Sequence, residues 1–268
     1  MPPPRTFIIA EVGVNHGGDP HAAWTLAALA KDCGAAAVKF QAFNSQRLWG
    51  DDRIAHLELS EAQLGDVASH CTKLGIEFMC TPFGMQEVAF LAPLVKRWKV
   101  ASGCINRPAL LAAIAATHKP VIMSTGMSTL DDIRAALPFL GYWEPAQNPQ
   151  SYALLHCTSA YPCPPDQVNL EAMGDLRFYF GDRCEIGYSD HTEGINIAIA
   201  AVAKGATIIE KHLTFDRNAT GPDHKASIEP EDFRRMVAAI REVEAAMGDG
   251  VKRVQPAEAA LRKEWGRG

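Results

Sequence analysis

The sequence of 268 residues lacks the features that mark several classes of protein. Its longest largely apolar stretch, Ile195–Ala203, is half a membrane span at most, and the apolar run before Glu11 is too short for a signal peptide. Lysine and arginine total 26 against 31 acidic residues, with no basic stripe for nucleic acid. The seven cysteines are scattered, and no pair has zinc-ribbon spacing. We therefore expect a cytoplasmic protein with reduced thiols that binds neither nucleic acid nor membrane.

The loop after the first apolar run reads EVGVNHGGD and lacks the GxGxxG spacing typical of a doubly wound sheet. Short β-branched runs and helical patterns instead alternate along the whole chain. Strands are predicted at Phe7–Gly13, Ala37–Gln41, Glu77–Phe83, Trp98–Gly103, Pro120–Gly126, Tyr152–Thr158, Cys184–His191 and Thr207–Thr214. Helices are predicted at His21–Cys33, Ser60–Leu74, Pro108–Thr117, Thr129–Leu140, Ile195–Lys204 and Glu229–Met247, with a short helix in the tail. Eight such units predict a single-domain (β/α)8 TIM barrel over residues 1–268, with the doubly wound open sheet as the alternative.

Polar side chains gather at the carboxyl ends of these predicted strands, where a barrel places its chemistry. By two-residue alternation, pairs in the second, third, seventh and eighth strands share one face. The residues concerned are Glu11, Lys39, Gln41, Thr81, Phe83, Lys99, Ser102, Ser189, His191, Glu210 and His212. Any one lysine or histidine in a strand is more often structural than functional. The fifth and sixth predicted strands also end in polar residues, in the strings MSTGMS and LLHCTSAYP. The coincidence across eight strand ends favours a site, because burying unpaired ions costs several kcal/mol.

Two kinds of chemistry follow from these residue types. Lys39 and Lys99, together with the nearby hydroxyls, would form a pocket for phosphate or carboxylate. His191 and His212, on neighbouring strands, can approach one divalent metal, and Asp223 could bind that metal or order its waters. Such ligands suit manganese, zinc or iron(II) acting as a Lewis acid.

Eight ordered strings from Phe7 to Met247 resemble the sialic acid synthase family, whose members make N-acetylneuraminic acid and related nonulosonic acids. The strings are AEVGVNHGGD, VKFQAF, CTPF, WKVASG, KPVIMSTGMS, LLHCTSAYP, IGYSDHT and IEKHLTFD…GPDHKAS. The resemblance implies a metal-assisted condensation of phosphoenolpyruvate with an open-chain amino-sugar aldehyde. C3 of phosphoenolpyruvate attacks the aldehyde, water adds to C2, and phosphate leaves by C–O cleavage.

Site roles carried over by motif follow from the same resemblance. Lys39, Thr81, Lys99, Ser102 and Ser189 would hold the phosphate and carboxylate, as part of a substrate site that includes Gln41, Phe83, Ser159 and Tyr161. Ser159 stands where some members have Asn, and Tyr161 would shape the pocket. Glu11, Asp223 and His191 are the expected catalytic residues, with His191 and His212 as metal ligands. The expected cofactor is manganese(II), with magnesium, cobalt or zinc as alternatives, and a homodimer is expected.

The sequence departs from the family pattern at three places. Cys104 stands where the family usually has Glu or Asp, and we expect a neutral, pocket-lining thiol there rather than a nucleophile. The stretch between Gln41 and Ser60, which carries sugar contacts in the family, is short. The printed sequence also shows no match to the family's C-terminal antifreeze-like domain. Two further hypotheses therefore stay open: a non-catalytic barrel that binds phosphoenolpyruvate or a nonulosonate, and an aldolase with Lys39 or Lys99 as a Schiff base.

Overall fold

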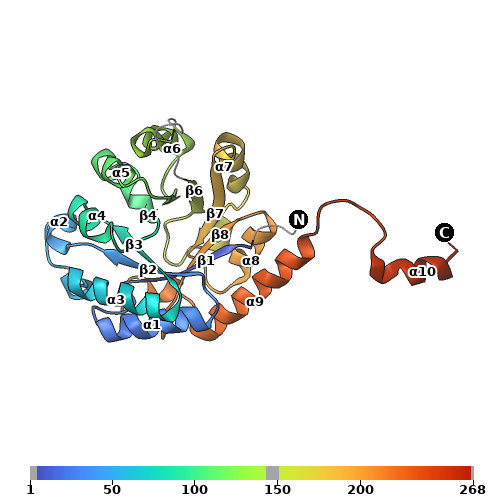
Figure 1. Cartoon of the computed structure of the whole chain (residues 1–268), viewed down its shortest axis with the longest axis horizontal. Helices are drawn as coiled ribbons and strands as arrows, with labels where there is room; N and C mark the ends of the chain where they lie inside the picture. Colours follow the sequence, from blue (N-terminus) through green and yellow to red (C-terminus); the bar gives the residue numbers. More distant parts are fainter. Residues whose placement is uncertain (1–4, 143–150, 267–268) are drawn as a thin grey trace.

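The computed structural model describes residues 5–142 and 151–266 as a barrel of eight parallel strands ringed by helices (Figure 1). The strands are β1 (Phe7–Gly13), β2 (Ala37–Ala42), β3 (Glu77–Pro82), β4 (Trp98–Val100), β5 (Val121–Ser124), β6 (Tyr152–Cys157), β7 (Cys184–Asp190) and β8 (Ile208–His212). Their order in the sheet is β3-β2-β1-β8-β7-β6-β5-β4. β3 and β4 also contact each other, but no hydrogen-bonded ladder joins them among the described residues. The barrel is therefore nearly closed, with its seam at the short strand β4.

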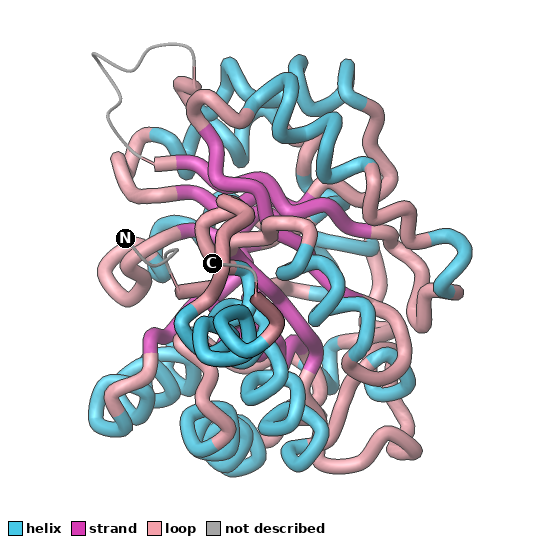
Figure 2. Tube along the Cα trace, turned by 90° about the vertical axis from the view of Figure 1, so that its right-hand side faces the viewer, coloured by secondary structure: helices cyan, strands magenta, loops and turns pink. Residues whose placement is uncertain are grey.

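Helices cover the outside of the strands, as Figure 2 shows. They are α1 (Pro20–Asp32), α2 (Ser45–Trp49), α3 (Glu61–Leu74), α4 (Met85–Leu91), α5 (Pro108–Ala115), α6 (Leu130–Ala136), α7 (Ala172–Phe180), α8 (Asn196–Ala203), α9 (Pro230–Met247) and α10 (Ala259–Glu264). α10 lies apart from the barrel at the end of an extended segment (Figure 1). Across the described chain, the helices are too short or too polar to traverse a bilayer.

The predicted TIM barrel is confirmed, and each predicted strand is present, although most are shorter than expected. The fourth strand ends at Val100 instead of Gly103 because a 3₁₀ turn, η2 (Ser102–Cys104), follows it. The helix predicted at Thr129–Leu140 is α6 followed by a 3₁₀ turn, η3 (Leu137–Leu140), because Pro138 cannot donate the next helical hydrogen bond. Helices α2, α4 and α7 were not predicted; α2 and α4 have only five and seven residues.

The inside of the barrel is layered along the strand direction. One buried apolar cluster takes residues from six strands: Ile9, Ala37, Met79, Ile122, Ala153, Leu155 and Ile208. Since side chains alternate between the two faces of a strand, the residue two positions further along points to the same interior. Those next residues include Glu11, Lys39, Thr81, Ser124, Cys157 and Glu210. The apolar layer is thus the floor on which a polar layer stands, at the carboxyl ends of the strands.

Candidate active site

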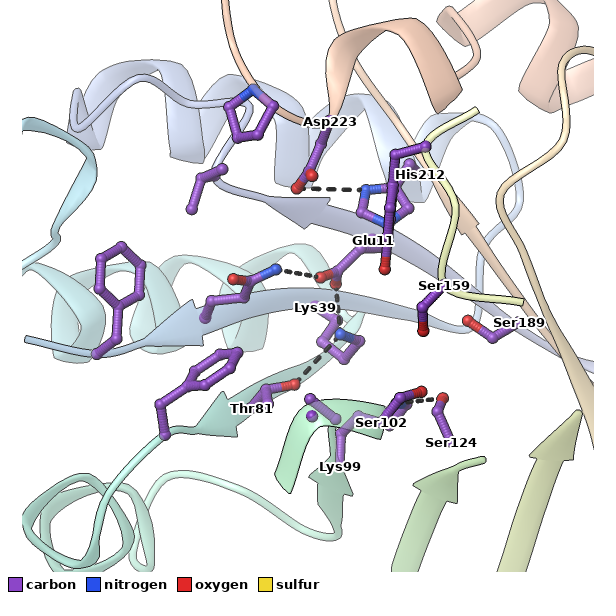
Figure 3. A pocket seen from close by; sticks show the side chains of 18 of the residues that line it. Glu11, Lys39, Thr81, Lys99, Ser102, Ser124, Ser159, Ser189, His212 and Asp223 are labelled. Atoms are coloured by element: carbon purple, nitrogen blue, oxygen red, sulfur yellow. Dashed lines mark hydrogen bonds and ion pairs between the residues drawn. The ribbon is translucent and has the colours of Figure 1, made fainter. Parts of the chain in front are cut away.

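A cavity of about 520 Å³ opens at the carboxyl ends of the strands (Figure 3). All the predicted site residues line it: Glu11, Lys39, Gln41, Thr81, Phe83, Lys99, Ser102, Ser159, Tyr161, Ser189, His191, His212 and Asp223. The strand-end pattern therefore brings together side chains that are up to 212 positions apart in the sequence. Their proximity is a structural finding, whereas the role of each residue stays a prediction.

Two buried lysines lie at the bottom of the cavity, each held by a carboxylate and a hydroxyl (Figure 3). Lys39 Nζ is 2.8 Å from Glu11 Oε2 and donates to Thr81 Oγ1 at 3.2 Å. Lys99 Nζ donates to Ser124 Oγ at 2.6 Å. Both ammonium groups are 3.7 Å from the same oxygen, Glu210 Oε1. The three strands β2, β4 and β8 thus converge on one cluster of opposite charges.

Burial and charge act in opposite directions on this cluster. Burial lowers the pKa of Lys39, but the attraction of Glu11 and Glu210 outweighs it and holds the pKa above its ordinary value. For Lys99 burial prevails, and its pKa falls. Burial also raises the pKa of Glu210, yet the two lysines bring it below its ordinary value. Glu210 is therefore the carboxylate that keeps two buried cations side by side, which is a costly arrangement that a purely structural core avoids.

Glu11 differs from Glu210 in its electrostatic environment. Burial raises its pKa from 4.5 to about 7, more than the ion pair with Lys39 lowers it. Its Oε1 accepts from Gln41 Nε2 at 3.1 Å. A carboxyl group with a pKa near neutrality can both take up and release a proton at physiological pH, as acid–base chemistry requires.

Gly13 brings the backbone close to that carboxyl group. It has φ +56°, a conformation that favours glycine, and a Cβ at this position would lie 3.0 Å from Asp223 Oδ2 and 3.2 Å from Glu11 Oε1. The backbone therefore approaches the two carboxyl groups closely. Burial raises the pKa of Asp223 as well, to about 6.

Several hydroxyl groups line the cavity near Lys99, where the chain leaves β4, β5 and β6. The backbone N–H of Gly126 donates to Ser102 Oγ at 3.0 Å. A Cβ on Gly126 would lie 2.3 Å from Ser159 Oγ and 2.9 Å from Ser102 Oγ. The missing side chain of Gly126 thus lets the Ser102 and Ser159 hydroxyl groups pack closely against the backbone, and both line the cavity, where hydroxyl groups can donate to an anion.

Two neutral imidazoles stand at the rim, on β8 and just after β7. The ring centroids of His191 and His212 are 5.4 Å apart, and burial lowers the pKa of both rings. His191 Nδ1 lies 2.7 Å from the carbonyl of Thr158, an acceptor only, so Nδ1 carries the proton and Nε2 keeps its lone pair. Buried His212 Nδ1 has no hydrogen-bond partner and lies 3.7 Å from Asp223 Oδ2. Both features suit imidazoles that bind a metal ion.

These imidazoles form a pair rather than a complete metal cage. Within residues 5–142 and 151–266, no three His, Cys, Asp or Glu side chains are arranged to hold a metal ion. A cation at His191 and His212 would therefore take its other ligands from water or substrate, as open catalytic sites do. Tyr161 packs against His191, with ring centroids 4.0 Å apart and ring planes tilted by 34°, and it bounds this side of the cavity.

Cys104 does not line the cavity, so the expectation of a pocket-lining thiol is wrong. The 3₁₀ turn η2 directs its side chain into the hydrophobic core, where the residue is 1% exposed. Burial raises the pKa of the thiol, which agrees with the expected neutral state. At this position the chain offers the cavity neither a base nor a nucleophile.

Sequence reasoning missed three residues of the inner cavity. Glu210 and His212 were placed on one face, but Glu210 was not assigned to the site. Ser124 and Cys157 were also left out, although each stands two positions after an interior apolar residue, Ile122 and Leu155. Applying the two-residue period to every strand, including the neutral residues, would have found all three.

The fold and the site together define the class of this protein: a (β/α)8 barrel whose polar cluster lies at the C-terminal mouth, where barrel enzymes place their chemistry. Residues 26–252 match the model of the NeuB family. The chain belongs to the NeuB family, which confirms the predicted resemblance.

Similar proteins agree with that membership. The chain is 40% identical to N,N'-diacetyllegionaminic acid synthase of Campylobacter jejuni, over 95% of this chain and 81% of the relative. It is 36% identical to human N-acetylneuraminate-9-phosphate synthase, over 97% and 76%. The crystal structure of N-acetylneuraminic acid synthetase from Leptospira borgpetersenii, in complex with citrate, superposes with a TM-score of 0.89 at 33% identity, covering 98% of this chain and 92% of that one.

Proposed function

We propose that this protein condenses phosphoenolpyruvate with an open-chain amino-sugar aldehyde, forming a nonulosonic acid and releasing phosphate. The observation that carries the proposal is the meeting of Lys39 and Lys99 with several hydroxyl groups and two neutral imidazoles in one cavity. The names of the synthases that it resembles support the class of product. A homodimer and a cytoplasmic location stay predictions that size-exclusion chromatography and fractionation would check.

The cluster of charges matches the substrate. Phosphoenolpyruvate carries about three negative charges, and the two ammonium groups and several hydroxyls would attract them, with Glu210 balancing one of the two positive charges. Lys39 and Lys99 would bind the phosphate and carboxylate, with Thr81, Ser102 and Ser189 completing the contacts. In the reaction, C3 bonds to the aldehyde carbon, water supplies the new oxygen at C2, and the C2–O bond breaks as phosphate leaves. Cations that are already fixed beside the departing phosphate stabilise its charge and so favour the cleavage, because the protein does not have to rearrange during the reaction.

The imidazole pair fits a divalent cation because His191 Nε2 keeps its lone pair and His212 Nδ1 has no hydrogen-bond partner. His191 and His212 would hold it, with manganese(II) as the first candidate and Asp223 in its outer shell. Such an ion supplies Lewis-acid polarisation of a carbonyl oxygen when bound. The His191 ring would hold the ion in a defined orientation, because its Nδ1–H donates to the Thr158 carbonyl, which fixes the tautomer.

Proton transfer falls to carboxyl groups that line the cavity, since Cys104 is buried in the core. Glu11, with a pKa of about 7, is the candidate acid and base for the sugar oxygen or for water. Asp223, with a pKa of about 6, stands next to it across Gly13. Glu210 stays ionised between the two lysines and acts by charge.

The proposal is tested by measuring phosphate release from phosphoenolpyruvate by the purified chain, with manganese(II) and a panel of N-acetylhexosamines and aldoses. Acceptor-dependent release supports it, and no release with any acceptor contradicts it. Tight binding of phosphoenolpyruvate without turnover would instead support the non-catalytic barrel. Because the pKa of Lys99 is lowered, a Schiff-base aldolase also needs a test, and a borohydride-stable pyruvate adduct on Lys99 or Lys39 would establish it.

Gly126→Ala is expected to raise the KM for phosphoenolpyruvate about tenfold, because the added methyl would collide with the hydroxyl groups of Ser159 and Ser102 and displace them. Steady-state kinetics measure this change, and a thermal scan shows whether the fold is intact. Gly65→Ala on α3 is the matched control, since a Cβ there meets nothing within 4 Å. An unchanged KM in Gly126→Ala would place the phosphate or carboxylate elsewhere.

Glu11→Gln is expected to raise the Tm of the metal-free protein at about pH 9 and to leave it nearly unchanged at about pH 5. The pKa of Glu11 is raised from 4.5 to about 7 in the folded state, so the free energy of unfolding falls as the pH rises from about 4.5 to about 7 and stays lowered above it, whereas the amide does not titrate. Each 1 kcal/mol corresponds to a shift of about 2–4 °C in a domain of this size. Glu242→Gln, on the exposed surface of α9, is the control. A lower Tm for Glu11→Gln at the higher pH would show that the carboxylate is stabilising.

A further inference from the structure

The loop that carries Asp223 is a long excursion between β8 and α9. It leaves the barrel after His212, and its two ends are joined where Leu213 forms a parallel bridge with Ile228. The backbone N–H of Ile228 also donates to the carbonyl of His212 at 2.9 Å. Asp223 lies in the interior of this loop, away from the bridge. The bridge alone therefore does not fix where its carboxyl group stands.

Asn15, in the segment that follows β1, is bonded to this loop at two points. Its Nδ2 donates to the carbonyl of Leu213 at 3.0 Å and to Ser227 Oγ at 2.8 Å. The Ser227 hydroxyl in turn donates to the carbonyl of Asp223 at 2.7 Å. Both side chains are buried, and neither residue lines the cavity. One amide group thus joins the β1 segment to the closed end of the loop and, through one hydroxyl, to the backbone of Asp223.

These hydrogen bonds form a chain with a single direction. The carbonyl of Leu213 can only accept, so it fixes which end of the Asn15 amide faces the loop. The Ser227 oxygen accepts from the amide while its hydrogen goes to Asp223, and bonds linked in this way strengthen one another. Among the described residues, the other end of the amide, Asn15 Oδ1, has no hydrogen-bond partner. Burying an unpaired oxygen costs stability, so the contribution of this amide is the placement of the loop.

We propose that Asn15 is a positioning residue that holds Asp223 in place through Ser227. The carboxyl group that it holds is directed towards His212, with Oδ2 3.7 Å from Nδ1 (Figure 3). On its other side the backbone of Gly13 is so close that a Cβ there would lie 3.0 Å from the same oxygen. The inference rests on the proposed function and deepens it, because a side chain of the site keeps its geometry only when the residues behind it are fixed.

Asn15→Leu keeps the size of the side chain and removes both donors. With phosphoenolpyruvate, manganese(II) and the best acceptor, we expect kcat for phosphate release to fall about 10–100-fold. The KM for phosphoenolpyruvate is expected to stay within about threefold, since Lys39 and Lys99 stand on other strands. The Asn15→Leu/Asp223→Ala double variant is expected to match the kcat of Asp223→Ala within about twofold, because Asn15 acts through Asp223. A merely structural residue would instead multiply the two losses.

Hydrogen exchange of backbone amides reports on the loop without turnover. The N–H of Ala226 donates to the carbonyl of Asp223, and the N–H of Ser227 donates to the carbonyl of His224, each at 3.1 Å. In Asn15→Leu we expect both amides to exchange at least about tenfold faster, and by a larger factor than the amides of β2. A general loss of stability would accelerate both groups of amides alike.

Two further variants make the test robust. Ser227→Ala removes one hydroxyl from the same chain of bonds, so it is expected to speed exchange in the loop and to lower kcat in the same way, and it replaces Asn15→Leu should that variant fail to fold. Thr117→Val is the control, because it removes a hydroxyl that bonds Trp98 Nε1 where β4 begins, outside the cavity. It is expected to leave kcat and the exchange of the loop within about twofold.

The outcomes separate this inference from the proposed function. Unchanged exchange of the loop in a folded Asn15→Leu or Ser227→Ala variant would overturn the positioning role, and so would losses of kcat that multiply in the double variant. If the natural protein releases no phosphate with any acceptor, the condensation fails, and the exchange rates still decide whether Asn15 holds the loop.

Discussion

Replacing Lys39 by methionine is expected to lower kcat/KM for phosphoenolpyruvate by about 10³-fold. The ammonium group is buried, ion-paired with Glu11 and bonded to Thr81, so it is held where the substrate's negative charge would lie. Removing one preorganised donor to a developing negative charge costs about 10²–10³ in rate. For Lys39→Met we expect a loss of kcat/KM at the upper end of this range, because Glu11 and Glu210 would then repel the substrate with one cation fewer to balance their charge.

The matched control for this variant is Lys204→Met. Lys204 pairs with Glu171 at 2.5 Å outside the cavity, so the substitution removes the same charge from the protein without altering the site. The kcat/KM of Lys204→Met is expected to stay within about twofold of the value for the natural protein. Should Lys39→Met fail to fold, the Lys39→Met/Glu11→Gln double variant restores the balance of charge, and its kcat/KM is compared with that of Glu11→Gln alone. A folded Lys39 variant with unchanged kcat/KM would remove this residue from the substrate site.

Lys211→Met is expected to lower the free energy of unfolding by about 3–5 kcal/mol, the largest stability effect that we predict. Lys211 and Asp190 are both fully buried, with Nζ 2.9 Å from Oδ2. The other carboxylate oxygen accepts from Tyr188 and from both the backbone and hydroxyl of Thr192. Without the lysine, Asp190 would keep a buried charge with no counter-ion.

Urea unfolding of Lys211→Met and of two companion variants measures this effect. The Asp190→Asn/Lys211→Met double variant is expected to recover part of the loss, because it removes the orphaned charge and keeps an acceptor for Thr192. Arg235→Met breaks the exposed pair with Asp232 on α9 and is expected to cost below about 1 kcal/mol. Equal losses in Lys211→Met and Arg235→Met would show that burial does not strengthen the inner pair.

The buried pair also bears on the site. Asp190 precedes His191, and Lys211 precedes His212, so alternation places the ion pair on the outer face of β7 and β8 when the imidazoles face the cavity. The pair joins the two strands at the point where they present their histidines. The stability of the fold and the geometry of the imidazole pair thus depend on the same strand ends.

Much of the barrel follows from sequence pattern because strands, caps and turns are local features. The capping box at Ser60 and the proline at the first position of α5 mark their helices as expected. The short helices α2 and α4 carry too few residues for a recognisable period, so they depend on tertiary packing. The fourth strand was predicted too long for a related reason. The apolar run leads directly into Ser102, and the residue types do not reveal that the backbone enters a 3₁₀ turn there.

The site follows from the sequence to a similar degree. Two-residue alternation and the resemblance to a family placed Lys39, His191 and their partners in one cavity. The role of Glu210 needed the structure, because a distance of 3.7 Å to both lysines arises from three strands and not from any local motif. The direction of the Cys104 side chain also needed the structure, since one turn of 3₁₀ helix decides whether the thiol faces the cavity or the core.

An anion held by the lysines and a cation held by the imidazoles are expected to share one site. Paramagnetic broadening of the ³¹P signal of phosphoenolpyruvate by manganese(II) measures how close the two ligands lie. We predict strong broadening with the natural protein, well above that of manganese(II) and phosphoenolpyruvate alone, and its loss in both His191→Ala/His212→Ala and Lys39→Met. Broadening that persists unchanged in the two-histidine variant, or its absence from the natural protein while both ligands are bound, would contradict the account.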